Sequence, residues 1–125
     1  MSVKIVNWLF RHYEVQARIL AWIGIFAIVV LSVVPAAERP VTDFAPQFEH
    51  VAAFALVAGA FSIGYDLSLA RLIFFALLFC GGIELLQVPL PTRHARVSDF
   101  VIDFIASCFA FALVHIGKKL VPLMI

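Results

Sequence analysis

The sequence contains four apolar stretches, each close to the length of a helix that crosses a lipid bilayer. They cover residues 17–34, 48–65, 68–88 and 98–116. About 20 residues of α-helix span the roughly 30 Å hydrocarbon core of a membrane. Segments that carry proline, or the turn signal Gly64-Tyr65-Asp66, separate the stretches and are expected to end the helices. The pattern predicts an all-α membrane protein, a four-transmembrane-helix bundle in a single domain over residues 1–125.

The amino-acid composition supports this fold class. Hydrophobic residues make up 64% of the chain and charged residues 14%, whereas soluble domains are typically about half apolar and a quarter charged. The excess apolar surface must face lipid, because a soluble domain of this length needs a polar exterior. The formal net charge is +1 and the nine Lys and Arg are scattered, so we expect no nucleic-acid partner.

Residues 1–16 precede the first apolar stretch and mix aromatic with basic side chains. This composition predicts a short interfacial helix on the membrane surface. The same residues would also suit a simple cytoplasmic lead-in to the first span. The segment is long for the charged region of a signal peptide, so we expect the first apolar stretch to be a retained helix.

The distribution of basic residues predicts the orientation of the bundle. With both termini on one side of the membrane, that side holds six of the nine Lys and Arg, and the other side holds Arg39, Arg93 and Arg96. The positive-inside rule then places both termini in the cytoplasm. We expect a multi-pass protein of the bacterial cytoplasmic (inner) membrane, with its first and third loops outside.

Small residues in the apolar stretches predict where helices pack closely, since lipid gives no hydrophobic drive between helices. They are Ala55 with Gly59, Ala106 with Ala110, and the pair Gly81 and Gly82. We expect the glycine pair to admit a neighbouring backbone.

Polar and ionisable side chains gather where three of the four expected helices reach the same side of the membrane. They are His50 at the start of the second stretch, Glu84 and Gln87 at the end of the third, Arg93 and Arg96 in the following loop, and Asp99 and Asp103 at the start of the fourth. Ionisable groups inside a membrane are costly and typically mark functional sites. This polar cluster is therefore the expected ligand-binding site.

Helical spacing predicts how the acids of the cluster point. Glu84 and Gln87 are three residues apart, while Asp99 and Asp103 are four apart, so each pair shares a helix face. A carboxylate that faces lipid is costly, so both faces should point into the bundle. Neighbouring carboxylates need a compensating cation or a shared proton. The loop arginines are the first candidates and His50 is the third.

Several kinds of chemistry remain open for this cluster. It could be a structural network in which Arg93 and Arg96 tie the third loop to the helix ends. It could instead be catalytic, with His50, Glu84 and Asp103 as candidate acids or bases. No HExxH or GxSxG motif is present. We expect no metal site and no cofactor, because the adjacent arginines would repel a cation, and we assign no role to the two cysteines.

The order of residues in the cluster resembles the VanZ-like family. Glu84-Leu-Leu-Gln87 is followed six residues later by Arg93 and a further six residues later by Asp99, with Asp103 one turn on. His50 at the start of a helix is similar to an upstream stretch of that family. The resemblance covers about half the chain and implies a bacterial cell-envelope membrane protein of a family named for reduced susceptibility to the glycopeptide antibiotic teicoplanin.

This chain departs from the family pattern at three positions. Asp103 and Ala106 stand where the family typically has Asn and Gly, and Glu49 replaces a basic residue that often precedes the histidine. A carboxylate in place of an amide can add a negative charge, so the charge balance of the pocket should differ from that of typical members.

The sequence thus leads to one functional hypothesis and two alternatives. The leading hypothesis is a protein that binds a polar or anionic lipid-linked headgroup at an outer-leaflet cluster, with membrane lipids or lipid-linked envelope precursors as partners. Arg93 and Arg96 would contact phosphate or carboxylate. The alternatives are a membrane-embedded acid/base hydrolase or transferase, and an assembly subunit that docks on a larger membrane protein.

Overall fold

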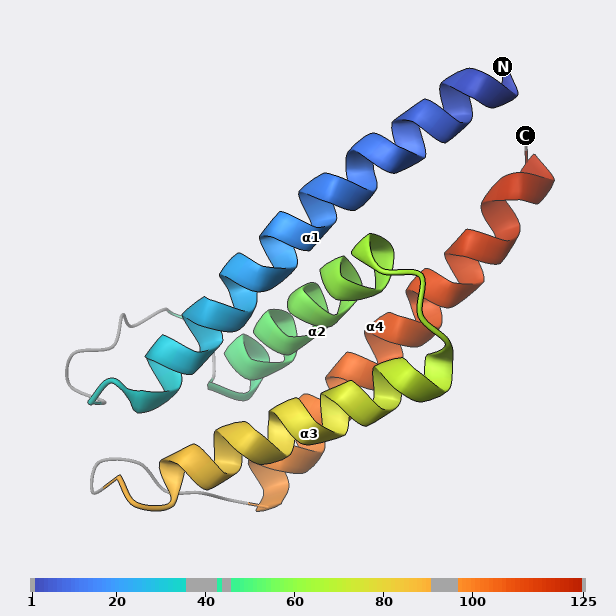
Figure 1. Ribbon diagram of the computed structural model, residues 1–125. Coiled ribbons are helices and arrows are strands. Elements are labelled where there is room, and N and C mark those ends of the chain that lie inside the picture. The colour runs from blue at the N-terminus through green and yellow to red at the C-terminus, as the bar shows by residue number, and fades with distance from the viewer. Residues whose placement is uncertain (1, 36–42, 44–45, 91–96, 125) are drawn as a thin grey trace.

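Four α-helices account for the fold, and they run in alternating directions (Figure 1). The computed structural model describes residues 2–35, 43, 46–90 and 97–124. The helices are α1 (Val3–Val33), α2 (Pro46–Gly64), α3 (Leu69–Gln87) and α4 (Val97–Met124). Strands are absent from these ranges, so the described chain is all-helical, as the sequence predicts.

The alternating helices give the bundle two distinct ends. The N- and C-terminal ends of the chain and the short turn from α2 to α3 lie at one end, which we name the termini end (Figure 1). The end where α1 and α3 finish and α2 and α4 begin is the distal end. This up-and-down order brings the starts of α2 and α4 to the same level as the last turn of α3, as the polar cluster requires.

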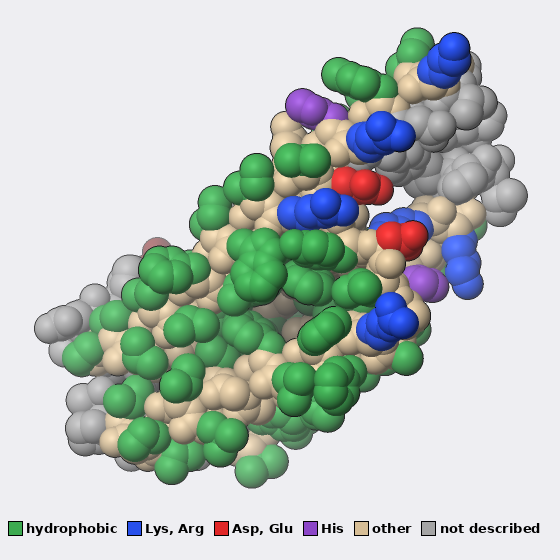
Figure 2. All heavy atoms as spheres, in the orientation of Figure 1, with side chains coloured by type: hydrophobic (Ala, Val, Ile, Leu, Met, Phe, Trp, Pro, Cys, Tyr) green, Lys and Arg blue, Asp and Glu red, His purple; other side chains and the backbone are tan. Residues whose placement is uncertain are grey.

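The described helices have the length and composition of a membrane protein. The segments Arg11–Val33, Leu69–Gln87 and Val97–Leu120 are long and apolar enough to cross a bilayer, and α2 contributes a shorter apolar helix over Phe48–Gly64. Large apolar side chains point outward from all four helices. Figure 2 shows hydrophobic side chains over most of one face, with charged side chains gathered toward the termini end. The outer surface is therefore suited to lipid.

The separate interfacial helix expected over residues 1–16 is not formed. Instead, α1 runs unbroken for 31 residues, so the lead-in and the first span are one helix. No proline lies within α1, and Glu14, Gln16, Ala17 and Arg18 are good helix formers at the expected break. Without a breaking residue, extending the helix costs less than starting a second one.

The other helix ends lie close to the expected ones, except at the end of α4. Pro35 follows α1 and Pro89 follows α3, each two residues after the last helical residue, because the residue before a proline disfavours helical geometry. Ser68 caps α3 by accepting a hydrogen bond from the backbone N–H of Arg71 at 3.4 Å. Beyond the expected end at residue 116, α4 continues to Met124.

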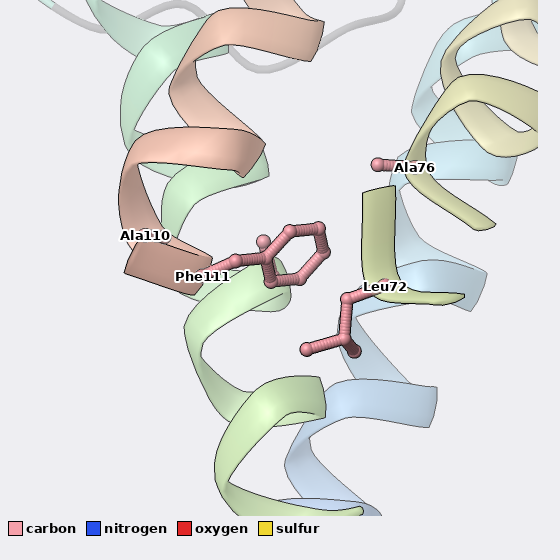
Figure 3. Packing of buried hydrophobic residues seen from close by; sticks show 5 residues of the cluster. Leu72, Ala76, Ala110 and Phe111 are labelled. Atoms are coloured by element: carbon pink, nitrogen blue, oxygen red, sulfur yellow. The ribbon is translucent and has the colours of Figure 1, made fainter. Parts of the chain in front are cut away.

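The helices form a four-sided arrangement in which α2 packs most extensively against α4. Further contacts join α1 to α2 and α3 to α4, while α1 and α3 touch only sparsely. Figure 3 shows Phe111 of α4 reaching toward Leu72 and Ala76 of α3, with Ala110 beside it. The sparse contact between α1 and α3 leaves one side of the bundle less closely packed than the others.

Some of the small residues expected to allow close approach of the helices lie at helix contacts, and others do not. Ala106 and Ala110 are buried on α4. A Cβ built on Gly59 would lie 4.0 Å from Val114 Cγ2, an ordinary van der Waals distance, so α2 contacts α4 there but the contact does not require a glycine. The expectation for Gly82 is wrong, because a Cβ there would meet nothing within 4 Å.

Two glycines outside the expected set mark the tightest contacts. A Cβ on Gly24 would lie 2.5 Å from Val57 Cγ2, and a Cβ on Gly64 would lie 2.9 Å from the backbone nitrogen of Arg18. Both contacts join α1 to α2. The α1–α2 interface therefore contains the closest backbone approach among the glycine positions.

Candidate functional site

A histidine and an aspartate from different helices meet near the distal end. His50 Nδ1 of α2 lies 3.1 Å from Asp103 Oδ1 and 3.4 Å from Oδ2 of α4. The Asp103 side chain is 2% exposed, whereas that of His50 is 31% exposed. A buried carboxylate thus holds an imidazole that is partly accessible.

Neighbouring side chains fix the position of this pair. The ring of His50 stacks on that of Phe54, one turn further along α2, with centroids 6.3 Å apart and an angle of 7° between the planes. Ser107, one turn beyond Asp103, donates its hydroxyl to the Asp103 carbonyl at 2.8 Å. Cys80 of α3 is buried near the Asp103 carboxylate. The pair therefore joins α2 to α4, with α3 close by.

The contact between His50 and Asp103 can be a hydrogen bond or an ion pair, depending on the protonation of the ring. In either state, Nδ1–H donates to the carboxylate. A buried carboxylate without a partner would be strongly destabilising in apolar surroundings. The sequence placed His50 behind the loop arginines as the partner of the acids, and among the described residues His50 is the partner that Asp103 contacts.

Gln87 belongs to a second polar contact on another side of the bundle. Its side chain is buried, and Nε2 donates to the backbone carbonyl of Ser32 on α1 at 3.2 Å. The Ser32 hydroxyl in turn donates to the Ile28 carbonyl at 2.6 Å. Gln87 therefore fastens the last turn of α3 to the last turn of α1.

We expect Gln87→Leu to lower the free energy of unfolding by about 1 kcal/mol, because it removes one interhelical hydrogen bond and leaves the Ser32 carbonyl with fewer donors. Denaturation in mixed micelles would measure the change. Leu86→Ala, at a neighbouring exposed position, reports the effect of a substitution that breaks no such bond. If Gln87→Leu unfolded at the wild-type denaturant concentration, the contact would contribute nothing to stability.

The remaining residues of the predicted cluster occupy different places. Glu84 and Asp99 are half-buried, Glu84 one turn from Cys80 on α3 and Asp99 one turn before Asp103 on α4. Arg93 and Arg96 lie outside the described residues. The structure thus brings His50 and Asp103 into contact and turns Gln87 toward α1.

The described residues contain no cluster suited to a metal ion. In residues 2–35, 43, 46–90 and 97–124, no three His, Cys, Asp or Glu side chains come close enough together to hold a metal ion. Cys80 and Cys108 are free thiols. The described site is therefore a polar pair within an apolar bundle.

The sequence prediction missed a group of polar contacts at the opposite end of α2. Arg18 Nε of α1 donates to the Gly64 carbonyl at 2.6 Å, and Lys118 Nζ of α4 donates to the Ser62 carbonyl at 2.6 Å. Trp22 Nε1 donates to the Tyr65 hydroxyl at 2.7 Å. The sequence signal that could have indicated these contacts is a basic residue at the very start of an apolar stretch. Its long side chain can reach the end of a shorter neighbouring helix.

These contacts stabilise the last turn of α2, whose carbonyl groups have no partners within the helix. Cations near a helix C-terminus also interact favourably with the helix dipole. Because α2 has 19 residues and α1 has 31, the end of α2 lies alongside the middle of α1 (Figure 1). The structure therefore has two polar levels, one at each end of α2.

No protein-family model, curated protein or solved structure matches the chain.

Proposed function

We propose that the protein is a four-span membrane protein of the bacterial cell envelope that binds the polar or anionic headgroup of a lipid at its distal end. The observation that carries this proposal is the His50–Asp103 pair, in which a buried carboxylate orients a partly exposed imidazole. Ionisable groups are energetically costly inside a membrane, and where they occur they typically mark a functional site.

The depth of the pair suits a lipid headgroup. His50 is four residues into α2 and Asp103 is six residues into α4. At 1.5 Å per residue these positions lie about 6 Å and 9 Å along their helices from the distal end. An imidazole at this depth can donate to a phosphate or sugar oxygen, and when protonated it also attracts the negative charge of a phosphate.

The sequence supplies three further supports for this proposal. Arg93 and Arg96 belong to the short segment between α3 and α4, where guanidinium groups would complement a phosphate. The resemblance to the VanZ-like family covers His50, Glu84, Gln87, Arg93 and Asp99 and favours a place in the bacterial inner membrane. Six of the nine Lys and Arg belong to the termini end, which favours cytoplasmic termini and an outer-leaflet site.

Binding of a radiolabelled polyprenyl phosphate to detergent-solubilised protein tests the proposal. We expect His50→Gln to weaken binding about tenfold, because an amide keeps hydrogen-bonding capacity but loses the charge-assisted contact. His115→Gln is the matched control, since this half-buried histidine lies near the other end of the bundle on α4. Equal affinity of His50→Gln and wild type would refute headgroup binding at this pair.

A second candidate function is acid/base catalysis on an envelope lipid. The geometry that favours it is the same contact, because a carboxylate that binds Nδ1–H fixes the tautomer in which Nε2 accepts a proton. Asp103 would orient His50, and half-buried Glu84 would be a further acid. Release of phosphate or a transferred group from the labelled lipid, lost in His50→Gln but kept in His115→Gln, would favour catalysis over binding alone.

A further inference from the structure

An apolar groove opens on the side of the bundle between α1 and α3, where these helices touch only sparsely. Its volume is about 490 Å³, and side chains from all four helices line it. Phe54, Ala58, Ala76 and Phe111 form its buried floor. Figure 2 shows a hollow with hydrophobic side chains around it on this face. The volume is within the range of about 300–1,000 Å³ that ligand pockets occupy.

Two arginines flank this groove at the termini end. On α1, Arg18 precedes the groove residue Trp22 by four positions, and on α3, Arg71 precedes the groove residue Phe75 by four positions. Residues four apart share a helix face. Each arginine is therefore one turn, about 5–6 Å, nearer the termini end than the aromatic residue below it.

The helix geometry favours a position of both arginine side chains on the termini side of the groove. Helical side chains point toward the N-terminus of their own helix, and α1 and α3 both begin at the termini end. Arg18 and Arg71 are exposed. The two charges thus flank the termini end of an apolar groove, and a phospholipid has the same order of charge and apolar surface.

The contacts of Arg18 leave its guanidinium able to bind an anion. Its Nε donates to the Gly64 carbonyl, and Cζ lies 4.9 Å from the centroid of the Tyr65 ring. A guanidinium has five N–H donors, and Nε supplies one of them. The acids at this end are Glu14 and Asp66, against the six basic residues Lys4, Arg11, Arg18, Arg71, Lys118 and Lys119. The termini end therefore attracts negative charge.

We propose that the groove holds one hydrocarbon chain of an anionic phospholipid whose phosphate lies between Arg18 and Arg71. The groove adjoins the His50–Asp103 pair through Phe54 and Ser107, but the proposed phosphate position lies at the termini end, away from the pair, and does not depend on the function proposed for that pair. Of the side chains that line the groove, Ser107 carries a hydroxyl and Trp22 an indole N–H, and both groups already donate hydrogen bonds. A hydrocarbon chain needs no further polar partner there, whereas a polar molecule would.

The contribution of charge is tested by native mass spectrometry of the purified full chain with dioleoyl phosphatidylglycerol and dioleoyl phosphatidylcholine. We expect one phosphatidylglycerol per chain to be retained, in preference to phosphatidylcholine. Arg71→Gln should reduce that preference about fivefold, the effect of one basic residue at an anionic membrane surface. Lys119→Gln removes the same charge from an exposed position on α4 that does not flank the groove, and should leave the preference unchanged.

The contribution of the groove is tested by filling it. Ile25 of α1 lines the groove, whereas Ile23 of the same helix is exposed and does not. Ile25→Trp should lower retention of both lipids while their ratio stays unchanged, and Ile23→Trp should retain them as the wild type does. Glycerol 3-phosphate, which carries the anionic group without a chain, should not compete with the bound lipid at equimolar concentration.

Four results would overturn the proposal. One is equal retention of the two lipids by the wild type. Another is an equal effect of Arg71→Gln and Lys119→Gln on the preference. The third is unchanged phosphatidylglycerol binding in Ile25→Trp. The fourth is a spectrum dominated by dimer without lipid, which would assign the groove to a helix of a second copy. None of these results bears on the binding of polyprenyl phosphate at His50.

Discussion

Replacing His50 with leucine should lower the free energy of unfolding by about 3 kcal/mol or more. The substitution leaves Asp103, whose side chain is 2% exposed, without the imidazole that lies 3.1 Å away. Removing one partner of a buried ion pair typically costs about 3–5 kcal/mol, because the other charge stays buried. Denaturation in mixed micelles, followed by circular dichroism, would measure the loss.

The double variant His50→Leu/Asp103→Leu provides the decisive control for this prediction. Replacing both members of a buried pair with apolar residues is often neutral, so the double variant should recover most of the lost stability. A single variant within 0.5 kcal/mol of wild type would contradict the buried pair. A double variant that folds normally but no longer binds polyprenyl phosphate would show that the pair serves function rather than stability.

Replacing Gly64 with alanine should destabilise the bundle by about 1–3 kcal/mol. Its new Cβ would lie 2.9 Å from the backbone nitrogen and 3.2 Å from the Cα of Arg18, and backbone atoms of α1 cannot move aside as a flexible side chain can. The helices must separate, which also lengthens the 2.6 Å hydrogen bond from Arg18 Nε to the Gly64 carbonyl.

Gly82→Ala is the matched control for Gly64→Ala. A Cβ on Gly82 meets no atom within 4 Å, so alanine there should change stability only through helix propensity, by about 0.5–1 kcal/mol in the stabilising direction. Thermal unfolding of both variants in the same detergent would compare them. Equal midpoints for the two variants would contradict the close approach of α1 and α2.

The sequence sufficed to predict the helices because the signals for their ends are local. Pro35 and Pro89 stop α1 and α3 wherever those helices lie, and a run of about 20 apolar residues specifies a helix in lipid without reference to its neighbours. The prediction of a separate interfacial helix over residues 1–16 was wrong for a related reason. A change from polar to apolar composition does not interrupt a helix that contains no breaking residue.

The partners within the site could be predicted only in part. Periodicity showed that Asp103 faces inward, but which side chain it meets depends on the rotation of α2 against α4, which spacing within one helix does not determine. Gln87 was expected to join the same cluster, yet the packing of α3 beside α1 directs it to the Ser32 carbonyl. The groove follows from sparse packing between α1 and α3, a property of the assembled bundle.

The polar contacts at the end of α2 have a consequence for the order in which the bundle assembles. The carbonyl groups of Gly64 and Ser62 depend on donors from residue 18 and residue 118, which lie on either side of α2 in the chain. Unpaired carbonyl groups resist entry into hydrocarbon. The second helix to be synthesised should therefore settle to its full depth only after the fourth has entered the membrane, so truncation before residue 118 should leave α2 close to the surface.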